Sequence, residues 1–249
     1  MPFTISHAAV VVPFTQTSRN YLSLTGLIIG SMVPDFLYFI FLNPYFNSGH
    51  QWWGIFVYDI PLSILLAYIY HMLVKPILVS FLPRWAGNRL LRYRWFNWNS
   101  YFRQHYVVVL ISVVSGILTH FFLDAFTHEE GYFVLLSSFL RRNITIWQHP
   151  MKMWYLMQYL SSVAGLLLLF YFFLKTPTVN NARKLPIARK AGFWSIVIVV
   201  SGIILLINEQ LHHINCRGLD YLATMLGGLF YGLLITVLGY RIYTSRSDR

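Results

Sequence analysis

Three ionisable residues recur at every fourth position of a strongly apolar stretch, "ILTHFFLDAFTHEEG", which covers residues 117–131. They are His120, Asp124 and His128. Four residues of an α-helix rise by about 6 Å and rotate the side chain by only about 40°, so a helix would carry all three on one face. Imidazole nitrogens and a carboxylate without a thiolate suit zinc, manganese or iron. We predict a divalent metal here, with zinc as the first choice and manganese or iron as alternatives.

The spacing of this triplet limits how many ions it can serve. His120 and His128 lie about 12 Å apart along a helix, whereas a metal–nitrogen bond is about 2.1 Å long, so one ion does not take both histidines. Two ions bridged by Asp124 fit the spacing. One ion also fits, with a single histidine as ligand and Asp124 as a second ligand or as the acceptor that fixes an imidazole tautomer. A divalent ion lowers the pKa of its bound water toward about 7, which favours hydrolysis.

Three further ionisable residues interrupt apolar stretches. Asp35 stands in "GSMVPDFLYF", His50 in "NSGHQWW" and Asp59 in "VYDIP". A charge in a bilayer is costly and is tolerated mainly where it faces other helices and finds a partner, so each is a functional candidate. We expect all three to meet the triplet at the outer ends of the helices. Asp59 would orient a ligand or take up a proton there.

Other polar residues in the apolar stretches have a simpler interpretation. A lone histidine in a helical bundle is more often a hydrogen-bonding partner between helices than a metal ligand. This interpretation applies to His71, His105 and His149, and to the pair Glu209 and His213. The single cysteine, Cys216, excludes an intramolecular disulfide and a cysteine-based zinc site.

The composition indicates the elements that must position these residues. The 249 residues are 57% hydrophobic and only 11% charged, with a mean hydropathy of +0.55, which is typical of an integral membrane protein. A helix needs about 20 apolar residues to cross a bilayer. We predict an all-α fold, a polytopic helical membrane bundle of six transmembrane helices. The predicted spans are roughly residues 21–44, 54–74, 105–127, 154–174, 192–209 and 221–241.

The N-terminal stretch, residues 2–14, is apolar but only about 20 Å long as a helix. Thr4 would cap it. In one interpretation it is an interfacial helix on the cytoplasmic face. In the other it is a short additional membrane helix that starts outside and descends to Arg19. The choice decides where His7 lies.

The basic residues predict the orientation of the helices. The formal net charge is +11, but Lys and Arg lie in short segments between apolar stretches, which indicates membrane lipids rather than nucleic acid as partners. Segments 75–103 and 175–190 and the C-terminal end carry most of them. The positive-inside rule therefore places the C terminus in the cytoplasm. We expect one integral membrane domain, residues 1–249, in which residues 176–249 add two transmembrane helices to the part, 1–175, that carries the motifs.

Several stretches resemble a family of bacterial membrane proteins catalogued as domain of unknown function 4184. They are "MPFTISHAAVVVPF", "IIGSMVPDFLYFI", "SGHQWWGIFVYDIPLSILL" and "SVVSGILTHFFLDAFTHEEG". More distantly, an early histidine, a "PD" after a Gly-rich apolar stretch and a later "THxxxD" look like the membrane-bound metal-dependent hydrolases of the YdjM type. That resemblance implies a bacterial cytoplasmic membrane and, by position, metal ligands at His7, Asp35, His50, His120 and Asp124. The chain departs from the pattern by lacking the second acid of "PDxD" and the element "HRGxTH".

These observations favour a metal-dependent hydrolase at the outer membrane face, acting on a lipid-linked phosphoester. His128 would join the five implied ligands, and Asp59 and Asp124 would take part in catalysis. Arg141 and Arg142 would hold a phosphate by paired hydrogen bonds. The alternative is a transporter or an ion or proton conduit that uses the same cluster. We rank it second because transporters usually show an internal repeat and a site near the bilayer midplane.

Overall fold

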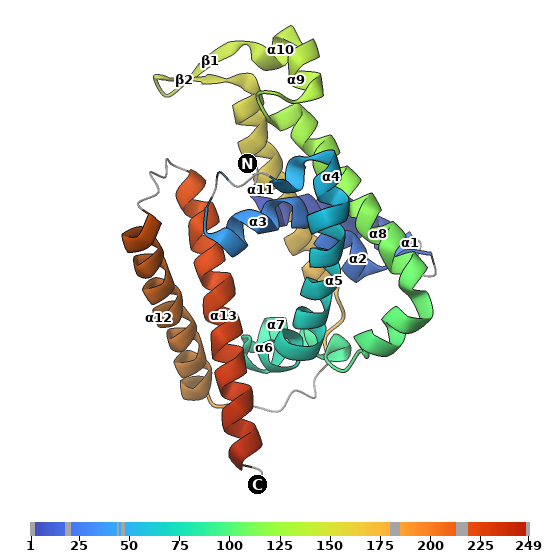
Figure 1. Ribbon diagram of the computed structural model, residues 1–249, viewed down its shortest axis with the longest axis vertical. Helices are drawn as coiled ribbons and strands as arrows, with labels where there is room; N and C mark the ends of the chain where they lie inside the picture. The colour runs from blue at the N-terminus through green and yellow to red at the C-terminus, as the bar shows by residue number, and fades with distance from the viewer. Residues whose placement is uncertain are drawn as a thin grey trace. The chain divides into compact units, whose positions relative to one another are not determined.

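The protein is almost entirely helical in this computed structural model (Figure 1). Within the described residues, five helices are long and apolar enough to cross a membrane, and a bent pair of shorter helices would make a sixth span. The predicted class, an all-α helical membrane protein, is confirmed at this level. The structure describes residues 3–17, 21–43, 45, 48–179, 185–212 and 219–247. Arg19, His213 and Cys216 lie outside these residues.

The chain divides into two compact units, each assembled from segments that are separate in sequence. Unit 1 consists of Met1–Asp35, Ser48–Ile64 and Gln104–Lys175. Unit 2 consists of Phe36–Asn47, Leu65–Arg103 and Thr176–Arg249. All residues predicted to bind metal, substrate or a proton belong to unit 1. The prediction of one membrane domain stays a prediction.

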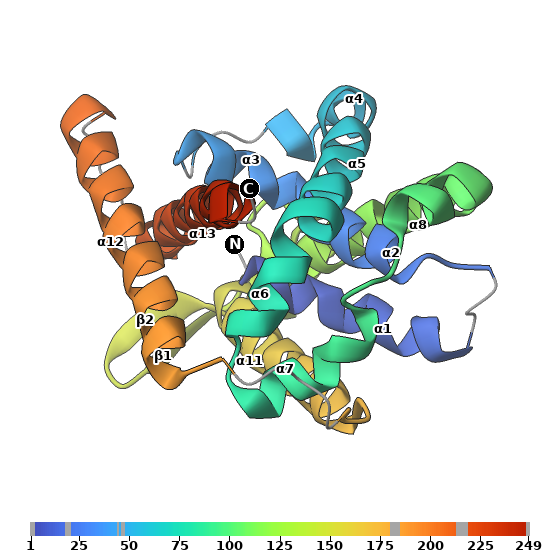
Figure 2. The ribbon, with the colours of Figure 1, turned by 90° about the horizontal axis from the view of Figure 1, so that it is seen from below.

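Unit 1 begins with a 3₁₀ turn, η1 (Thr4–His7), which continues as α1 (Ala8–Thr17). Both elements pack against α11 (Met153–Lys175). The Phe3 amide donates to Ser162 Oγ over 2.9 Å and holds the start of the turn on α11. Figure 2 shows α1 lying beside α11. The N-terminal helix is therefore an integral part of unit 1.

The predicted role of Thr4 as a helix cap is wrong. Phe3 stands at the cap position of η1, and no side chain accepts a hydrogen bond there. The Thr4 hydroxyl instead donates to Oδ2 of Asp35 over 2.7 Å. A hydroxyl used in this tertiary contact is not available to the helix end, and the contact brings the N-terminal turn toward the predicted ligands.

The predicted first span, residues 21–44, is broken in the middle. It consists of α2 (Leu24–Gly30) and α3 (Val33–Phe41), which meet at an angle of 60°. Pro34 explains the break, because proline has no amide hydrogen and its ring would clash with the carbonyl of Gly30. We predicted a continuous helix because the stretch is apolar throughout, and hydropathy does not register the lost hydrogen bond.

The long helix α8 (Trp98–Thr127) carries His120 and Asp124. Its backbone is non-helical at His105. The α2 helix crosses α8 at close range, because a Cβ added to Gly116 would lie 2.5 Å from the Leu27 carbonyl. Small residues commonly permit such approaches between membrane helices. The crossing fixes α2, and with it the broken span, against the helix that carries His120 and Asp124 and ends one residue before His128.

The second segment of unit 1, Ser48–Ile64, carries His50 and Asp59 and consists of short elements. In order they are η2 (Ser48–His50), α4 (Trp52–Gly54), η3 (Ile55–Asp59) and the first half of α5 (Ile60–Tyr68), which continues into unit 2. The η3 element is a π-helical turn, which is rare and often found at functional sites. It ends at Asp59, the residue that we predicted to orient a ligand or take up a proton.

A small hairpin follows α8 through two short helices, and no strand was predicted there. The elements are α9 (Tyr132–Leu136), α10 (Ser138–Arg141), β1 (Asn143–Ile146) and β2 (His149–Lys152), gathered at the top of Figure 1. The strands are antiparallel and joined by Trp147 and Gln148, whose φ angles are 49° and 66°. Two-residue turns with positive φ suit hairpins, but they usually contain Gly, Asn or Asp. The atypical turn residues and strands of four residues hid the hairpin from sequence analysis.

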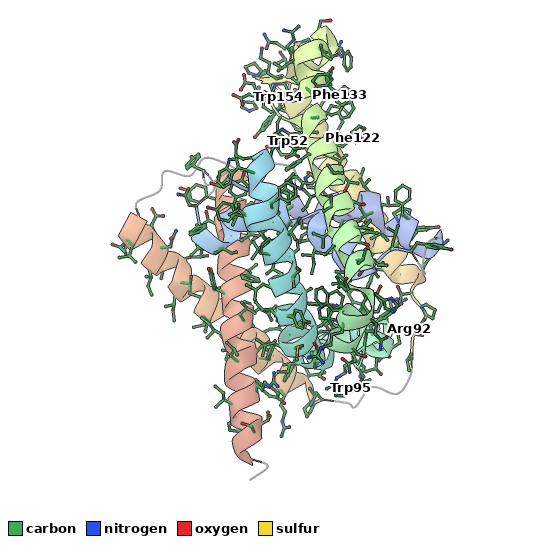
Figure 3. All side chains as sticks on the ribbon, turned by 45° about the vertical axis from the view of Figure 1, so that its right-hand side comes forward. Trp52, Arg92, Trp95, Phe122, Phe133 and Trp154 are labelled. Carbon is green, nitrogen blue, oxygen red and sulfur yellow. The ribbon has the colours of Figure 1, made fainter. Side chains whose placement is uncertain are left out.

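Aromatic side chains fill the junction between α8 and α9. The rings of Phe126 and Phe133 stack with centroids 4.1 Å apart, and Phe122 meets Phe133 edge-on at 6.0 Å. Figure 3 labels Phe122 and Phe133 at this end of α8. The junction continues the apolar surface of α8 past the end of the helix.

Unit 2 contains the remaining helices. They are η4 (Ile69–Val74), α6 (Lys75–Phe81), α7 (Arg84–Leu90), η5 (Leu91–Tyr93), α12 (Ile187–His212) and α13 (Leu219–Ser247). The last two lie side by side (Figures 1 and 2). A core of Phe81, Phe193, Val197 and Val237 joins them to α6. The unit is held mainly by apolar contacts.

The five other predicted spans fall within candidate membrane helices that extend beyond them. The observed candidates are Trp52–Phe81, Trp98–Leu136, Met153–Lys175, Ile187–Leu211 and Tyr221–Ser245. Hydropathy marks only the apolar part of a helix, about 20 residues. The polar ends continue the hydrogen-bonded backbone, so the real helices are longer.

Candidate metal centre

The six predicted metal ligands converge within unit 1. Each comes to the same place from one of four chain segments: η1, the start of α3, the η2 turn, and the end of α8. Two groups of three have ligand atoms within 4.8 Å of one another: His7, Asp35 and His120, and His50, His120 and Asp124. His120 belongs to both groups and therefore stands at the centre of the cluster.

The centre of the cluster has the dimensions of a metal site. His50 Nε2 and His120 Nε2 lie 3.2 Å apart. Oδ2 of Asp124 lies 3.5 Å from His50 Nε2 and 3.3 Å from His120 Nε2. Oδ1 of Asp35 lies 3.5 Å and 3.7 Å from the same two nitrogens. Ligand atoms about 2.1 Å from a tetrahedral ion are about 3.4 Å apart. The two histidine nitrogens therefore fit such an ion together with the Asp124 oxygen, and equally together with the Asp35 oxygen.

The break in the first span orients His120. The Asp35 amide would reach the Ser31 carbonyl in an uninterrupted helix, but it donates to the Met32 carbonyl over 3.2 Å instead. The Ser31 carbonyl lies 2.9 Å from Nδ1 of His120. A carbonyl only accepts, so Nδ1 must carry a hydrogen, and in the neutral ring Nε2 then presents a lone pair to the cluster. Metal-bound histidines usually have this arrangement.

Asp35 is oriented by the N-terminal turn. Its Oδ2 accepts the hydrogen bond from Thr4, while its Oδ1 faces His50 and His120. Because Asp35 is 1% exposed, this hydroxyl is a fixed partner and not an exchangeable solvent contact. A hydrogen-bonded carboxylate of this kind is typical of the surroundings of a metal.

His7 and His128 approach Asp124 from its other oxygen. His7 Nε2 lies 3.6 Å and His128 Nδ1 lies 3.4 Å from Oδ1 of Asp124. The His7 ring stacks on His120 with centroids 4.1 Å apart and an angle of 21°. Within the described part of the chain, neither ring nitrogen of His7 has a hydrogen-bond partner, and Oδ1 of Asp124 has none either. Buried polar atoms without hydrogen bonds are rare, and a bound ion or a water is one way to satisfy them.

The cluster opens on the side of two histidines. His50 is 23% and His128 is 34% exposed, whereas His7, Asp35 and His120 are at most 1% exposed. Asp124 lies between them at 13%. A ligand or substrate would therefore reach the cluster past His50 and His128.

Asp59 lies next to the cluster but outside both groups of ligands. It is fully buried, and neither carboxylate oxygen has a hydrogen-bond partner among the described residues. A Cβ added to Gly49 would lie 3.2 Å from its Oδ1, which places the carboxylate beside the turn that carries His50. Its catalytic role stays a prediction, and its position leaves it free to accept a proton or a hydrogen bond.

The two arginines predicted to bind a phosphate lie at the end of α10. Arg141 is the last residue of the helix, and Arg142 follows it. Both are exposed, and the Arg142 guanidinium lies over the ring of Phe139, 4.2 Å from its centroid. No hydrogen bond or ion pair joins Arg141 or Arg142 to the cluster within the residues that the structure describes. Their role in binding a phosphate stays a prediction.

Two parts of the site were missed by sequence reasoning. Thr4 was assigned to a helix cap, although its hydroxyl supports Asp35. The Ser31 carbonyl was not considered, because backbone acceptors leave no mark in composition. The "PD" at residues 34–35 was the available signal, since a proline in an apolar helix frees backbone carbonyls near a possible ligand.

No curated protein and no solved structure matches the chain. Residues 1–238 match the family described as Domain of unknown function (DUF4184). The match takes in both units and every residue of the cluster. The chain therefore belongs to the DUF4184 family.

Proposed function

We propose that this protein is a membrane-embedded, metal-dependent hydrolase. The observation that carries the proposal is the set of separations, all between 3.2 and 3.7 Å, that join the His50 and His120 nitrogens to Asp35 and Asp124. These separations match the edges of a tetrahedral site. Zinc is our first choice of ion, with manganese or iron as alternatives, because all the donors are nitrogen and oxygen.

The bound ion would act as a Lewis acid and lower the pKa of its bound water toward about 7. The protein's own residues would do the remaining work. Asp35 and His120 are held by Thr4 and the Ser31 carbonyl, so the ligands are oriented before the ion arrives. Asp59 is a buried carboxylate with unpaired oxygens, which would accept a proton during hydrolysis.

The proposed substrate is a lipid-linked phosphoester at the outer face of a bacterial cytoplasmic membrane. The positive-inside rule supports this orientation, with the C terminus in the cytoplasm. The resemblance to membrane-bound metal-dependent hydrolases of the YdjM type supports the reaction class. Arg141 and Arg142 would hold the phosphate by paired hydrogen bonds.

One observation favours a second candidate, an ion conduit or transporter. The first span is broken at the point where it reaches the cluster, with a bend of 60° between α2 and α3. Transporters place ions and substrates at such discontinuous helices. Uptake of zinc or manganese into vesicles that contain the protein, without hydrolysis of any phosphoester, would favour this candidate.

The test is the metal content of the full chain purified in detergent without a chelator. We expect at least one zinc, manganese or iron ion per chain, and much less in the variant His50→Ala. The matched control is His149→Ala, which removes an exposed histidine of β2 and should leave the content unchanged. Metal-free protein after mild purification would overturn the proposal. With metal present, turnover of a panel of phosphoesters and phospholipids, and its loss in Asp59→Asn, tests the reaction.

A further inference from the structure

The two oxygens of Asp124 face different pairs of histidines. Oδ2 lies within 3.5 Å of His50 Nε2 and His120 Nε2. Oδ1 lies 3.6 Å from His7 Nε2 and 3.4 Å from His128 Nδ1. Carboxylates that divide their oxygens in this way bridge two ions in two-metal hydrolases. From this division we infer that the centre holds a second metal ion, between His7, His128 and Oδ1 of Asp124, with Asp124 as the bridge.

The histidine at the centre of the cluster cannot serve both positions. His120 donates its Nδ1 hydrogen to the Ser31 carbonyl, which leaves a single lone pair at Nε2. That lone pair belongs to the first ion, the one in the proposed function. His7 lies beside it, 1% exposed, and neither of its ring nitrogens makes a hydrogen bond to the described residues. A separate ion would satisfy one of these nitrogens and Oδ1 of Asp124, which also lacks a hydrogen bond among the described residues.

The stacking of two imidazole rings matches the spacing of a two-metal site. The rings of His7 and His120 are 4.1 Å apart and inclined by only 21°, and both direct Nε2 toward the Asp124 carboxylate. Ions in two-metal sites lie about 3.5–4 Å apart. Nearly parallel rings at this distance are therefore spaced to bind one ion each.

His128 completes the second position from the open side. Its Nδ1 also lies 3.3 Å from the Asp124 carbonyl and 3.4 Å from Thr127 Oγ1. These contacts are long, and an ion at Nδ1 would replace the hydrogen that makes them, leaving the ring hydrogen on Nε2. Thr127 Oγ1 also donates to the Leu123 carbonyl over 3.2 Å. Two histidines and one carboxylate oxygen leave a coordination position open, as in catalytic sites with three protein ligands. The second ion would thus be reached from solvent past His128, which is 34% exposed.

The inference rests on the proposed function for the first ion. The number of metal ions bound per chain tests the second position separately from the proposed function. The full chain is stripped, reloaded with Mn²⁺ in detergent, and measured by elemental analysis and electron paramagnetic resonance. We expect two ions per chain and the signal of two coupled Mn²⁺ ions. His7→Gln and His128→Ala should each hold one ion and show the signal of isolated Mn²⁺. His149→Ala should keep two.

Each other outcome has a definite meaning. One ion in the unaltered chain overturns the second position and leaves the proposed function standing. No ion in the unaltered chain overturns both. Two coupled ions that persist in His7→Gln and in His128→Ala overturn this choice of ligands. His128 is 34% exposed, so its variant tests the inference even where His7→Gln fails to fold.

Discussion

The two units both bury ionisable residues, but they satisfy them differently. In unit 2, Lys75 is 2% exposed, donates to the Phe96 carbonyl over 3.2 Å and lies 2.8 Å from His71 Nδ1. The His71 ring stacks on Trp98 with centroids 4.8 Å apart. In unit 1, the buried His7 keeps ring nitrogens without hydrogen-bond partners among the described residues. The lysine in unit 2 is enclosed by its own chain, whereas the cluster in unit 1 keeps buried acceptors without hydrogen bonds among the described residues.

The kind of unpaired atom strengthens this contrast. Among the described residues of unit 2, the buried unpaired side-chain atoms are Trp98 Nε1 and Arg94 Nε, which only donate hydrogen bonds and cannot bind a cation. In unit 1 the buried atoms without hydrogen bonds include carboxylate oxygens of Asp59 and Asp124. A buried charge in a membrane helix is therefore a weak sign of a metal site. Convergent unpaired acceptors are a stronger one.

The variant His120→Ala should cause the largest loss of metal binding in unit 1, and so tests the difference between the two units most directly. It removes the one side chain shared by both groups of ligands. The loss of metal affinity should exceed the about 10–100-fold that outer-shell changes cost. Isothermal titration of the stripped protein with zinc measures it. His71→Ala in unit 2 is the control, and equal losses in both variants would mean that the loss reflects unfolding.

The variant Thr4→Val should weaken metal binding less, by about 10–100-fold, because it removes the hydroxyl that orients Asp35 but no ligand. The same titration with zinc measures the change. Thr4→Ser retains the hydroxyl and should bind nearly as tightly as the unaltered chain. An affinity unchanged in Thr4→Val would show that Asp35 needs no such support.

The variant Gly165→Ala should reduce the amount of bound metal only slightly and should lower the stability of the fold measurably. A Cβ at this position would lie 2.9 Å from Cβ and from the carbonyl oxygen of Ser6, so the turn that carries His7 must shift. Overpacking of this kind costs about 1–3 kcal/mol. Thermal unfolding measures the loss, and metal analysis should show that only the second ion is affected. Gly192→Ala is the control, because nothing lies within 4 Å of its added Cβ.

The variant Lys75→Met should leave metal binding unchanged. It keeps most of the apolar stem but removes the donor to His71 and to the Phe96 carbonyl, which should destabilise the protein by about 1–3 kcal/mol. Unfolding in denaturant checks the stability, and zinc titration checks the binding. A change in zinc affinity would show that the contacts of Lys75 in unit 2 affect the metal ligands in unit 1.

Sequence reasoning reached the helical class and most residues of the cluster by simple rules, while His7 was implied only by the resemblance to the YdjM-type hydrolases. The spacing of His120 and Asp124 puts them on one helical face, and the cost of charge in lipid singles out Asp35. It failed where a feature depends on tertiary geometry. The bend at Pro34 has a local cause, yet its angle and the use of Ser31 depend on α8. The hydroxyl of Thr4 has several possible local partners, and only the folded chain selects Asp35.

The carbonyl that orients His120 belongs to the main chain, and this affects how the site tolerates mutation. Replacement of Ser31 by another amino acid leaves its carbonyl in place, so substitutions at that position do not remove the hydrogen bond to Nδ1. A carboxylate in the same role would be lost by a single substitution. The tautomer of His120 is thus unaffected by most point mutations at Ser31. Insertions or deletions between the two half-helices are the changes to which it stays vulnerable.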